Sequence, residues 1–222
     1  MDFSQEQINQ LKEDFKYVHF LYCDKMQEYP ELNLKNELSK EYFFHGFLRR
    51  LKTLKKCIEN IYTIYPPDRT QILKDDEKID LEIYLQSFIV NVFGCVDNLT
   101  RILVEEKSIQ LSNLNQLHFE NEEIKKNLSC NFKQYWGDNL KKWYEEYCKN
   151  YRHALGHRIP LYIPHGFDKE KNMKHILPLM KHSYSENSKA VIFHAQVLTD
   201  FNTVIELADK VFEELFPSPN TK

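Results

Sequence analysis

The segment from residue 79 to residue 106 constrains the fold of this chain more than any other. Its apolar residues recur every three or four positions, which places them along one stripe of an α-helix. They are so numerous that neighbours are needed on several sides of the helix, and Gly94 in its middle allows one of them to approach closely. The sequence therefore predicts a long central helix in an all-α protein.

Five further segments have the same helical periodicity and end at prolines or polar connectors. We expect these helices at residues 4–29, 36–65, 121–129, 136–155 and 188–216. Together they predict an up-and-down helical bundle. The 222 residues suit a single helical domain, with an N-terminal helix at 1–30 added to a bundle at 36–216.

The composition limits which cellular compartment and which binding partners we expect for this protein. The net charge of −3 excludes a uniformly basic surface, so any contact with RNA must be local. The five cysteines form no Cys-x-x-Cys pair, which favours reduced thiols. The first residues are polar and acidic, and no apolar run approaches the roughly 20 residues that span a bilayer. We therefore expect a cytoplasmic protein with no membrane association.

Residues 150–158 hold the densest cluster of reactive side chains, with Arg152, His153 and His157 among them. Imidazole exchanges a proton near neutral pH, and a guanidinium group binds two phosphate oxygens at once. On an ideal helix His153 and His157 share a face, whereas Arg152 and His157 are separated by about 140°. We expect the helix to end near Gly156, where unwinding would bring His157 back towards Arg152.

The spacing Arg152-x4-His157 resembles the Arg-x4-6-His motif of HEPN domains, the higher eukaryotes and prokaryotes nucleotide-binding superfamily. Members commonly carry a polar residue directly after the arginine, as His153 does here. As in that family, the motif lies late in a helical chain, at a helix end, with one more long helix after it. Residues 91–99 are similar to an earlier HEPN helix that bears a buried polar patch.

The resemblance implies a four-helix bundle at 36–216 and a homodimer in which two motifs meet in one composite site. It implies a metal-independent endoribonuclease that needs no cofactor and cleaves RNA by attack of the 2′-hydroxyl on the adjacent phosphate. Arg152 would bind the scissile phosphate, His157 would act as acid or base, and His153 would assist or orient. By the same resemblance the protein would be a toxin or defence component, restrained by an inhibitory partner protein.

Other interpretations fit the same residues. Arg152 can be a helix-end cation stabilised by the helix dipole, and His157 can bond the last carbonyl groups of its helix. The protein can then be a non-catalytic HEPN-like dimer that binds a protein or a nucleotide. His153 and His157 can also hold a metal ion, with a third ligand from His165, His175 or a distant carboxylate.

Several residues outside the motif have a structural and a functional interpretation. Asp97 and Asn98 more often tie helices together through hydrogen bonds than form the floor of a site. The basic residues near Arg50 form either a solvated face or a surface that attracts RNA. The extended stretch 160–164, with a proline at each end, either packs apolar side chains and so fixes His157, or serves as a lid or partner-binding edge. The side chains expected to pack are those of Ile159, Leu161, Tyr162 and Ile163. The aromatic residues expected in the core or at a dimer surface are Trp136, Trp143, Tyr144, Tyr147 and Tyr151.

Overall fold

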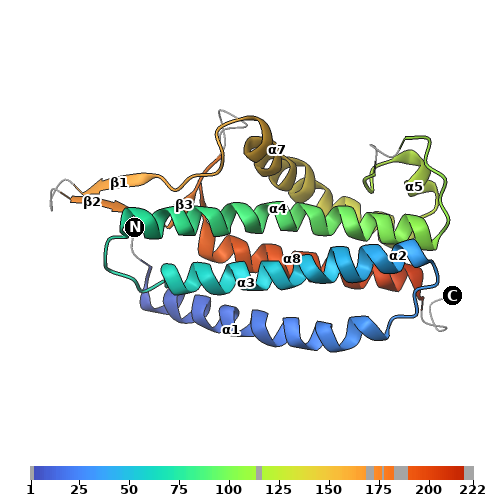
Figure 1. The fold of residues 1–222 in the computed structure, drawn as a ribbon, viewed down its shortest axis with the longest axis horizontal. Coiled ribbons are helices and arrows are strands. Elements are labelled where there is room, and N and C mark those ends of the chain that lie inside the picture. The colour runs from blue at the N-terminus through green and yellow to red at the C-terminus, as the bar shows by residue number, and fades with distance from the viewer. Residues whose placement is uncertain (1–2, 114–116, 169–172, 177, 183–189, 218–222) are drawn as a thin grey trace.

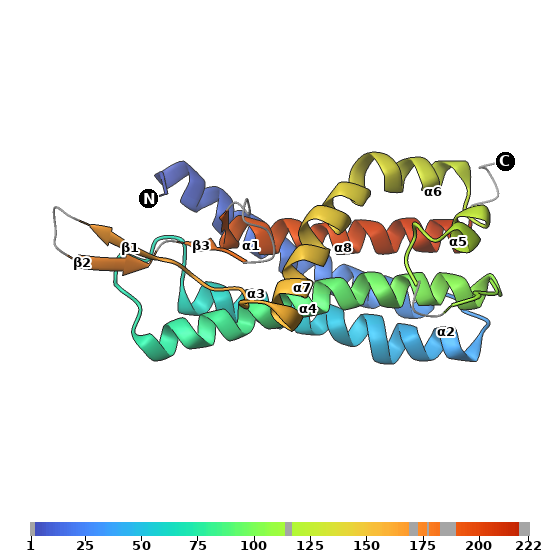
Figure 2. The ribbon, with the colours of Figure 1, turned by 90° about the horizontal axis from the view of Figure 1, so that it is seen from above.

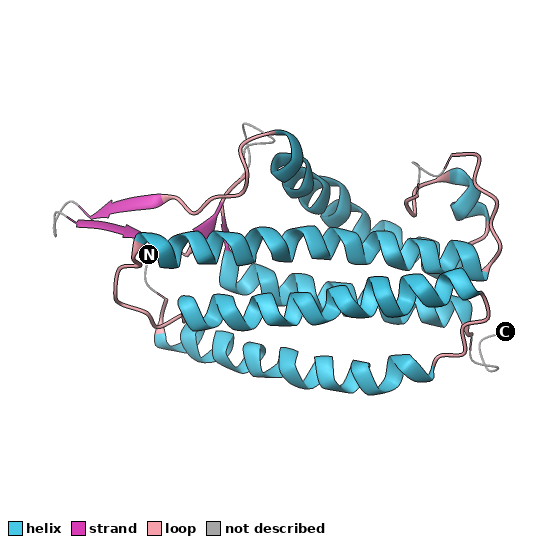
Figure 3. Ribbon diagram, in the orientation of Figure 1, coloured by secondary structure: helices cyan, strands magenta, loops and turns pink. Residues whose placement is uncertain are grey.

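The computed structural model describes residues 3–113, 117–168, 173–176, 178–182 and 190–217, without the side chains of the strand residues 165–168 and 173–176. Most of this chain is helical (Figures 1 and 3). Its helices are α1 (Gln5–Glu28), α2 (Glu37–Glu41), α3 (Leu48–Ile64), α4 (Asp75–Glu106), α5 (Glu122–Lys126), α6 (Cys130–Tyr135), α7 (Lys149–His157) and α8 (Phe193–Leu215). The predicted all-α class is confirmed.

Four long helices, α1, α3, α4 and α8, lie alongside one another (Figures 1 and 2). α4 packs against α3 and α8, and α1 lies against the other side of α3 and α8. Buried apolar side chains from Leu11 in α1 to Phe212 in α8 form one continuous cluster. Only two residues of α1, Leu11 and Val18, are buried, so α1 forms a peripheral layer of the bundle.

α4 is the central helix that the apolar pattern predicts. It begins at Asp75, four residues before the predicted start, because three acidic residues form its first turn, where the helix dipole favours negative charge. By length and composition alone α4 could also cross a membrane. Its apolar face is instead largely covered by α3 and α8, as expected for the core helix of a bundle.

The chain is helical without interruption from residue 130 to residue 157. Two π-helical stretches, Trp136–Leu140 and Trp143–Cys148, lie within this segment, between α6 and α7. The predicted helix 136–155 starts too late because Ser129 caps the helix six residues earlier, its hydroxyl accepting from the amide of Phe132 at 3.1 Å. The segment crosses from α8 at its start to α4 at its end (Figure 2).

Two small antiparallel strand pairs follow α7, and the sequence pattern predicts neither. β1 (His165–Asp168) pairs with β2 (Met173–Ile176) and extends beyond the bundle, whereas β3 (Leu179–Met180) pairs with β4 (Val191–Ile192) close to the start of α8. α8 begins at Phe193 rather than at 188, and the first two residues of the predicted helix, 188 and 189, lie outside the described residues.

Candidate functional site

The residues of the motif lie on α7, and a buried polar cluster fixes the π-helical stretch directly before α7 to α8. Asp200 of α8 accepts hydrogen bonds from the indole Nε1 of Trp143 at 2.9 Å, the hydroxyl of Tyr147 at 2.8 Å and the amide of Gln196 at 2.8 Å. Burial raises the pKa of Asp200 to about 6, against the opposing effect of these three donors. Tyr151 lies one turn further along and is buried. The helical segment that ends in α7 is thus held at Trp143 and Tyr147, directly before α7 begins.

The outer face of α7 carries Arg152, whose side chain is exposed. Its guanidinium lies over the ring of Phe93 on α4, with Cζ 5.2 Å from the ring centroid. Tyr144 also stacks on Phe93, with the ring centroids 5.6 Å apart. Arg152 therefore rests on an aromatic platform that joins α4 to the 130–157 segment, and its charged end stays accessible to solvent.

Asp97, one turn after Phe93 on α4, lies among three cations. Burial raises the pKa of its carboxyl group to about 6, while the charges of Arg152, Arg50 and Lys149 act in the opposite direction. A carboxyl group with this pKa changes charge just below neutral pH. The polar face of α4 thus places a titrating acid beside the arginine of the motif.

The two histidines of the motif share a face of α7, as predicted, with ring centroids 6.2 Å apart. Partial burial, and then the charge of Arg152, lower the pKa of His153. His157 is exposed. α7 ends at His157, one residue after the predicted end near Gly156, but the expected unwinding at Gly156 does not occur, because only Arg158 adopts an extended conformation.

The continuation of α7 has a direct consequence for the motif. With both residues in helical conformation, Arg152 and His157 are about 140° apart around the helix axis. The proposed unwinding that would bring them together in one chain does not occur. The shared site of these two residues across a dimer axis therefore stays a prediction.

The extended stretch after α7 docks on α4 and only half of its predicted apolar contacts form. The amide of Ile163 donates to the carboxylate of Glu82 at 2.9 Å, and Gln86 donates to the carbonyl of Leu161 at 3.0 Å. Leu161 and Ile163 are buried, whereas Ile159 is 63% and Tyr162 is 38% exposed. An extended chain points alternate side chains to opposite sides, so Tyr162, between Leu161 and Ile163, faces away from α4.

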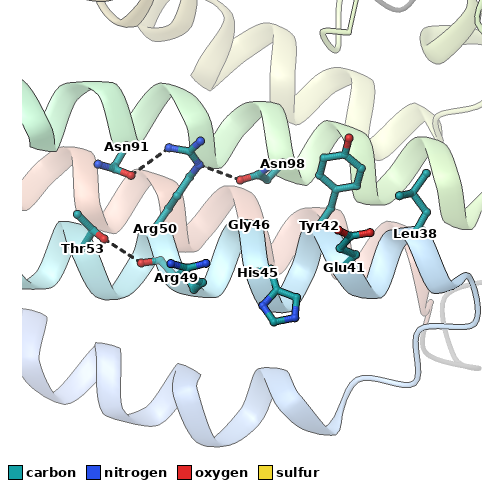
Figure 4. Close-up of a pocket in the computed structure, with 10 residues that line it drawn as sticks. All are labelled: Leu38, Glu41, Tyr42, His45, Gly46, Arg49, Arg50, Thr53, Asn91 and Asn98. Carbon is teal, nitrogen blue, oxygen red and sulfur yellow. Dashed lines mark hydrogen bonds between the residues drawn. The ribbon is translucent and has the colours of Figure 1, made fainter.

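A second polar site lies between α3 and α4, around Arg50 (Figure 4). Its Nε donates to Asn98 and its Nη1 donates to Asn91, both at 3.0 Å. The predicted role of Asn98 in tying helices together is confirmed. The surrounding cavity has a volume of about 440 Å³, and we call it the Arg50 groove. Its lining residues are Leu38, Glu41, Tyr42, His45, Gly46, Arg49, Arg50, Thr53, Asn91 and Asn98.

Sequence reasoning placed Arg50 only in a general basic face and missed its fixed position. One signal was present, because Asn91, Gly94 and Asn98 are spaced to share one face of α4. Asp200 was also missed, although an aspartate within the apolar pattern of α8 marks a buried polar partner. The five aromatic residues singled out in the 130–157 segment all pack in or against the apolar core.

The proposed metal site at His153 and His157 lacks a third ligand among the side chains that the structure describes. These side chains contain no group of three histidine, cysteine or acidic residues close enough to hold an ion. The side chains of His165 and His175 lie outside that description.

Comparisons of the chain with protein-family models, with curated proteins and with solved structures found no match.

Proposed function

We propose that this protein is a homodimeric, metal-independent endoribonuclease of the HEPN type, with its site at the outer face of α7. The observation that carries the proposal is the joint exposure of Arg152 and His157 on a helix that continues directly from the stretch held by Asp200. A rigid support with accessible reactive groups is what a site for a polymeric substrate requires.

The chemistry follows from these side-chain types. The 2′-oxygen of a ribose attacks the adjacent phosphorus, the bond to the 5′-oxygen breaks, and a 2′,3′-cyclic phosphate and a 5′-hydroxyl result. Arg152 binds the non-bridging oxygens and offsets the charge that develops on them. His157 removes the proton of the 2′-hydroxyl or protonates the leaving oxygen. The lowered pKa of His153 keeps this imidazole neutral at pH 7, so it can accept a hydrogen bond that orients a reacting group.

A second copy of the chain supplies what one copy lacks. Because Arg152 and His157 point in different directions from α7, we propose that the arginine of one copy works with the histidine of the other. An exposed apolar residue beside the motif supports this arrangement, since Val90 on α4 is 46% exposed. Val90 lies one helical turn before Phe93, the platform under Arg152.

The test is cleavage of RNA in EDTA by the wild type and by the Arg152→Ala and His157→Ala variants, with analysis of the end groups. We expect the wild type alone to cleave and to leave a 2′,3′-cyclic phosphate. Lys142→Ala, which changes an exposed residue of the same helical segment, is the control and should cleave normally. Equal cleavage by all variants would place the activity elsewhere.

Mixed dimers test how the site is composed. If the arginine and the histidine come from different copies, a heterodimer of Arg152→Ala and His157→Ala subunits retains one intact pair and recovers part of the activity. If both come from the same copy, the mixture stays inactive. Absence of cleavage by folded wild-type dimers would favour the non-catalytic HEPN-like dimer that binds a protein or nucleotide.

The biological setting rests on the family resemblance. A role as a toxin or defence component held in check by an inhibitory partner stays a prediction, to be tested by the effect of expression on cell growth with and without the motif. We also propose a cytoplasmic location. The five unpaired cysteines, three of them buried, are compatible with that reducing compartment.

A further inference from the structure

The Arg50 groove contains a guanidinium group that is fixed in place without a carboxylate partner. Arg69 and Arg101, two other described arginines, pair with Glu77 at 2.9 Å and Glu105 at 2.6 Å. Arg50 is half-buried and forms no ion pair with a described residue; its two hydrogen bonds go to neutral asparagine oxygens. A partly desolvated cation of this kind favours an anionic partner.

The backbone of α4 is shaped to hold this guanidinium. A Cβ atom added at Gly94 would lie 2.4 Å from Cζ of Arg50, so the group occupies the space that any other residue would fill. The same holds on the other wall, where a Cβ at Gly46 would lie 2.9 Å from the amide of Asn98. Arg50 and Asn98 thus lie pressed against backbone that has no side chain, which limits the rotamers open to both.

The bonding of Arg50 leaves one edge of its guanidinium for a ligand. Nε and Nη1 donate to the asparagines, and Nη2 makes no hydrogen bond within the described chain. Figure 4 shows the guanidinium lying between Asn91 and Asn98, with Glu41, the one carboxylate of the lining, further along near Tyr42 and Leu38. Asp97, whose carboxyl group is affected by the charge of Arg50, lies outside this lining, so the side chains that line the groove next to Arg50 carry net positive charge.

The positive charge continues along α3. A neighbouring cavity of about 520 Å³ shares Arg49 and Thr53 with the Arg50 groove and adds Lys52 and Lys56 to its lining. This second lining contains no carboxylate. Four cationic side chains thus line two adjoining cavities in a protein whose net charge is −3, so the local positive charge is not a property of the whole surface.

We propose that the Arg50 groove binds phosphate groups of a nucleotide or of an RNA strand. Nη2 of Arg50 donates to one phosphate oxygen, Arg49 contributes charge from the rim, and Lys52 and Lys56 hold the next phosphate in the adjoining cavity. The groove lies on the α3 side of α4, apart from the motif on α7. The proposal therefore does not depend on cleavage of RNA by Arg152 and His157.

Binding is measured by titration calorimetry on the full chain, with three probes: pyrophosphate, AMP and a short single-stranded RNA carrying 2′-O-methyl groups. The methylated RNA lacks the attacking hydroxyl, so binding and cleavage are separated. We expect the wild type to bind a probe and Arg50→Gln to bind it about tenfold more weakly. Lys133→Gln, which removes one positive charge from an exposed position on α6, is the control and should bind normally.

A second variant retains the arginine and all charges. Gly94→Ala displaces the guanidinium and should weaken binding as Arg50→Gln does, with circular dichroism used to verify that the variant is folded. Arg50-dependent binding of pyrophosphate or AMP would identify a nucleotide site, and Arg50-dependent binding of RNA alone would identify a path for the strand. Failure of folded wild-type protein to bind any probe, or equal binding by wild type and Arg50→Gln, would overturn the proposal.

Discussion

Arg50 and Arg152 lie on different sides of α4 and both act on the charge of Asp97. Arg50 is half-buried, bonded to two asparagines and pressed against a glycine. Arg152 is exposed and rests on the ring of Phe93. The comparison indicates that Arg50 is preorganised by contacts within its own chain, whereas Arg152 can still adapt to a substrate or to a second subunit.

The physical difference lies in what each guanidinium loses when a ligand arrives. Arg50 has already lost part of its hydration and much of its rotamer freedom on folding, so binding costs it little more of either. Arg152 is exposed and contacts the ring of Phe93, so it keeps more of its hydration and rotamer freedom until a partner approaches. Arg50 therefore suits steady binding of a phosphate group, and Arg152 suits contacts that tighten during a reaction.

The largest expected effect separates the two arginines by kinetics. Arg152→Ala should lower kcat for RNA cleavage by about a hundredfold or more, because it removes charge stabilisation at the reacting phosphate. Arg50→Gln should raise KM by about tenfold and leave kcat nearly unchanged, because it weakens binding of the strand. Steady-state rates on one RNA substrate measure both. A loss of kcat in both variants would erase the distinction.

The next effect concerns the support of Arg50. Gly94→Ala should destabilise the fold by about 1–3 kcal/mol, because the added Cβ overlaps the guanidinium. Gly137→Ala is the matched control: it lies in the 130–157 helical segment, and its added Cβ meets nothing within 4 Å. That change should be neutral or stabilising by about 0.5–1 kcal/mol. Urea unfolding measures both changes in stability. Equal effects would mean that the guanidinium of Arg50 moves away from the added Cβ at little cost in free energy.

Truncation of each arginine should give a smaller difference. Arg50→Ala loses two charged hydrogen bonds and should cost about 1.5–3 kcal/mol of unfolding free energy. Arg152→Ala loses one contact with an aromatic ring at an exposed site and should cost about 0.5–1 kcal/mol. Thermal and urea unfolding at one pH test the ranking. A greater loss from Arg152→Ala would show that the platform on Phe93 stabilises the fold more than the bonds of Arg50 do.

The smallest expected effect is the pH dependence that Asp97 contributes. Its pKa is about 6 in the folded protein, above the value near 3.9 of an unfolded chain, so the folded state binds more protons between these values. The stability contributed by this group is present below pH 4 and is lost as the pH rises through 6.

Asp97→Asn removes this titration. Relative to wild type, the variant should therefore gain about 1–2 kcal/mol of stability between pH 4 and pH 7. Urea unfolding at several pH values measures the change, with Asp80→Asn, an exposed residue of α4, as control. A parallel pH profile for wild type and Asp97→Asn would mean that the arginines offset burial completely.

Much of the fold was predictable because helices depend on residues close in sequence. The stripe in 79–106 predicted α4, and the pattern in 36–65 predicted the continuous helix that ends in α3. The strands were missed because they are short and lie in a segment with no regular alternation. The helix end near Gly156 was predicted to within one residue, but the unwinding at Gly156 was wrong, because a glycine unwinds a helix only where the backbone turns, and here the backbone stays helical through His157.

The sequence by itself determined the long helices and the residue types of the motif, whereas the roles of Arg152, His153 and His157 come from a family resemblance and stay a prediction. Only the tertiary structure decided that Arg50 meets Asn91 and Asn98, which lie 41 and 48 residues away in the chain. It also decided that Asp200 anchors the segment that carries the motif. Periodicity shows which side of a helix is polar, but the partner across a helix contact depends on how whole helices pack, and that is set by the entire core.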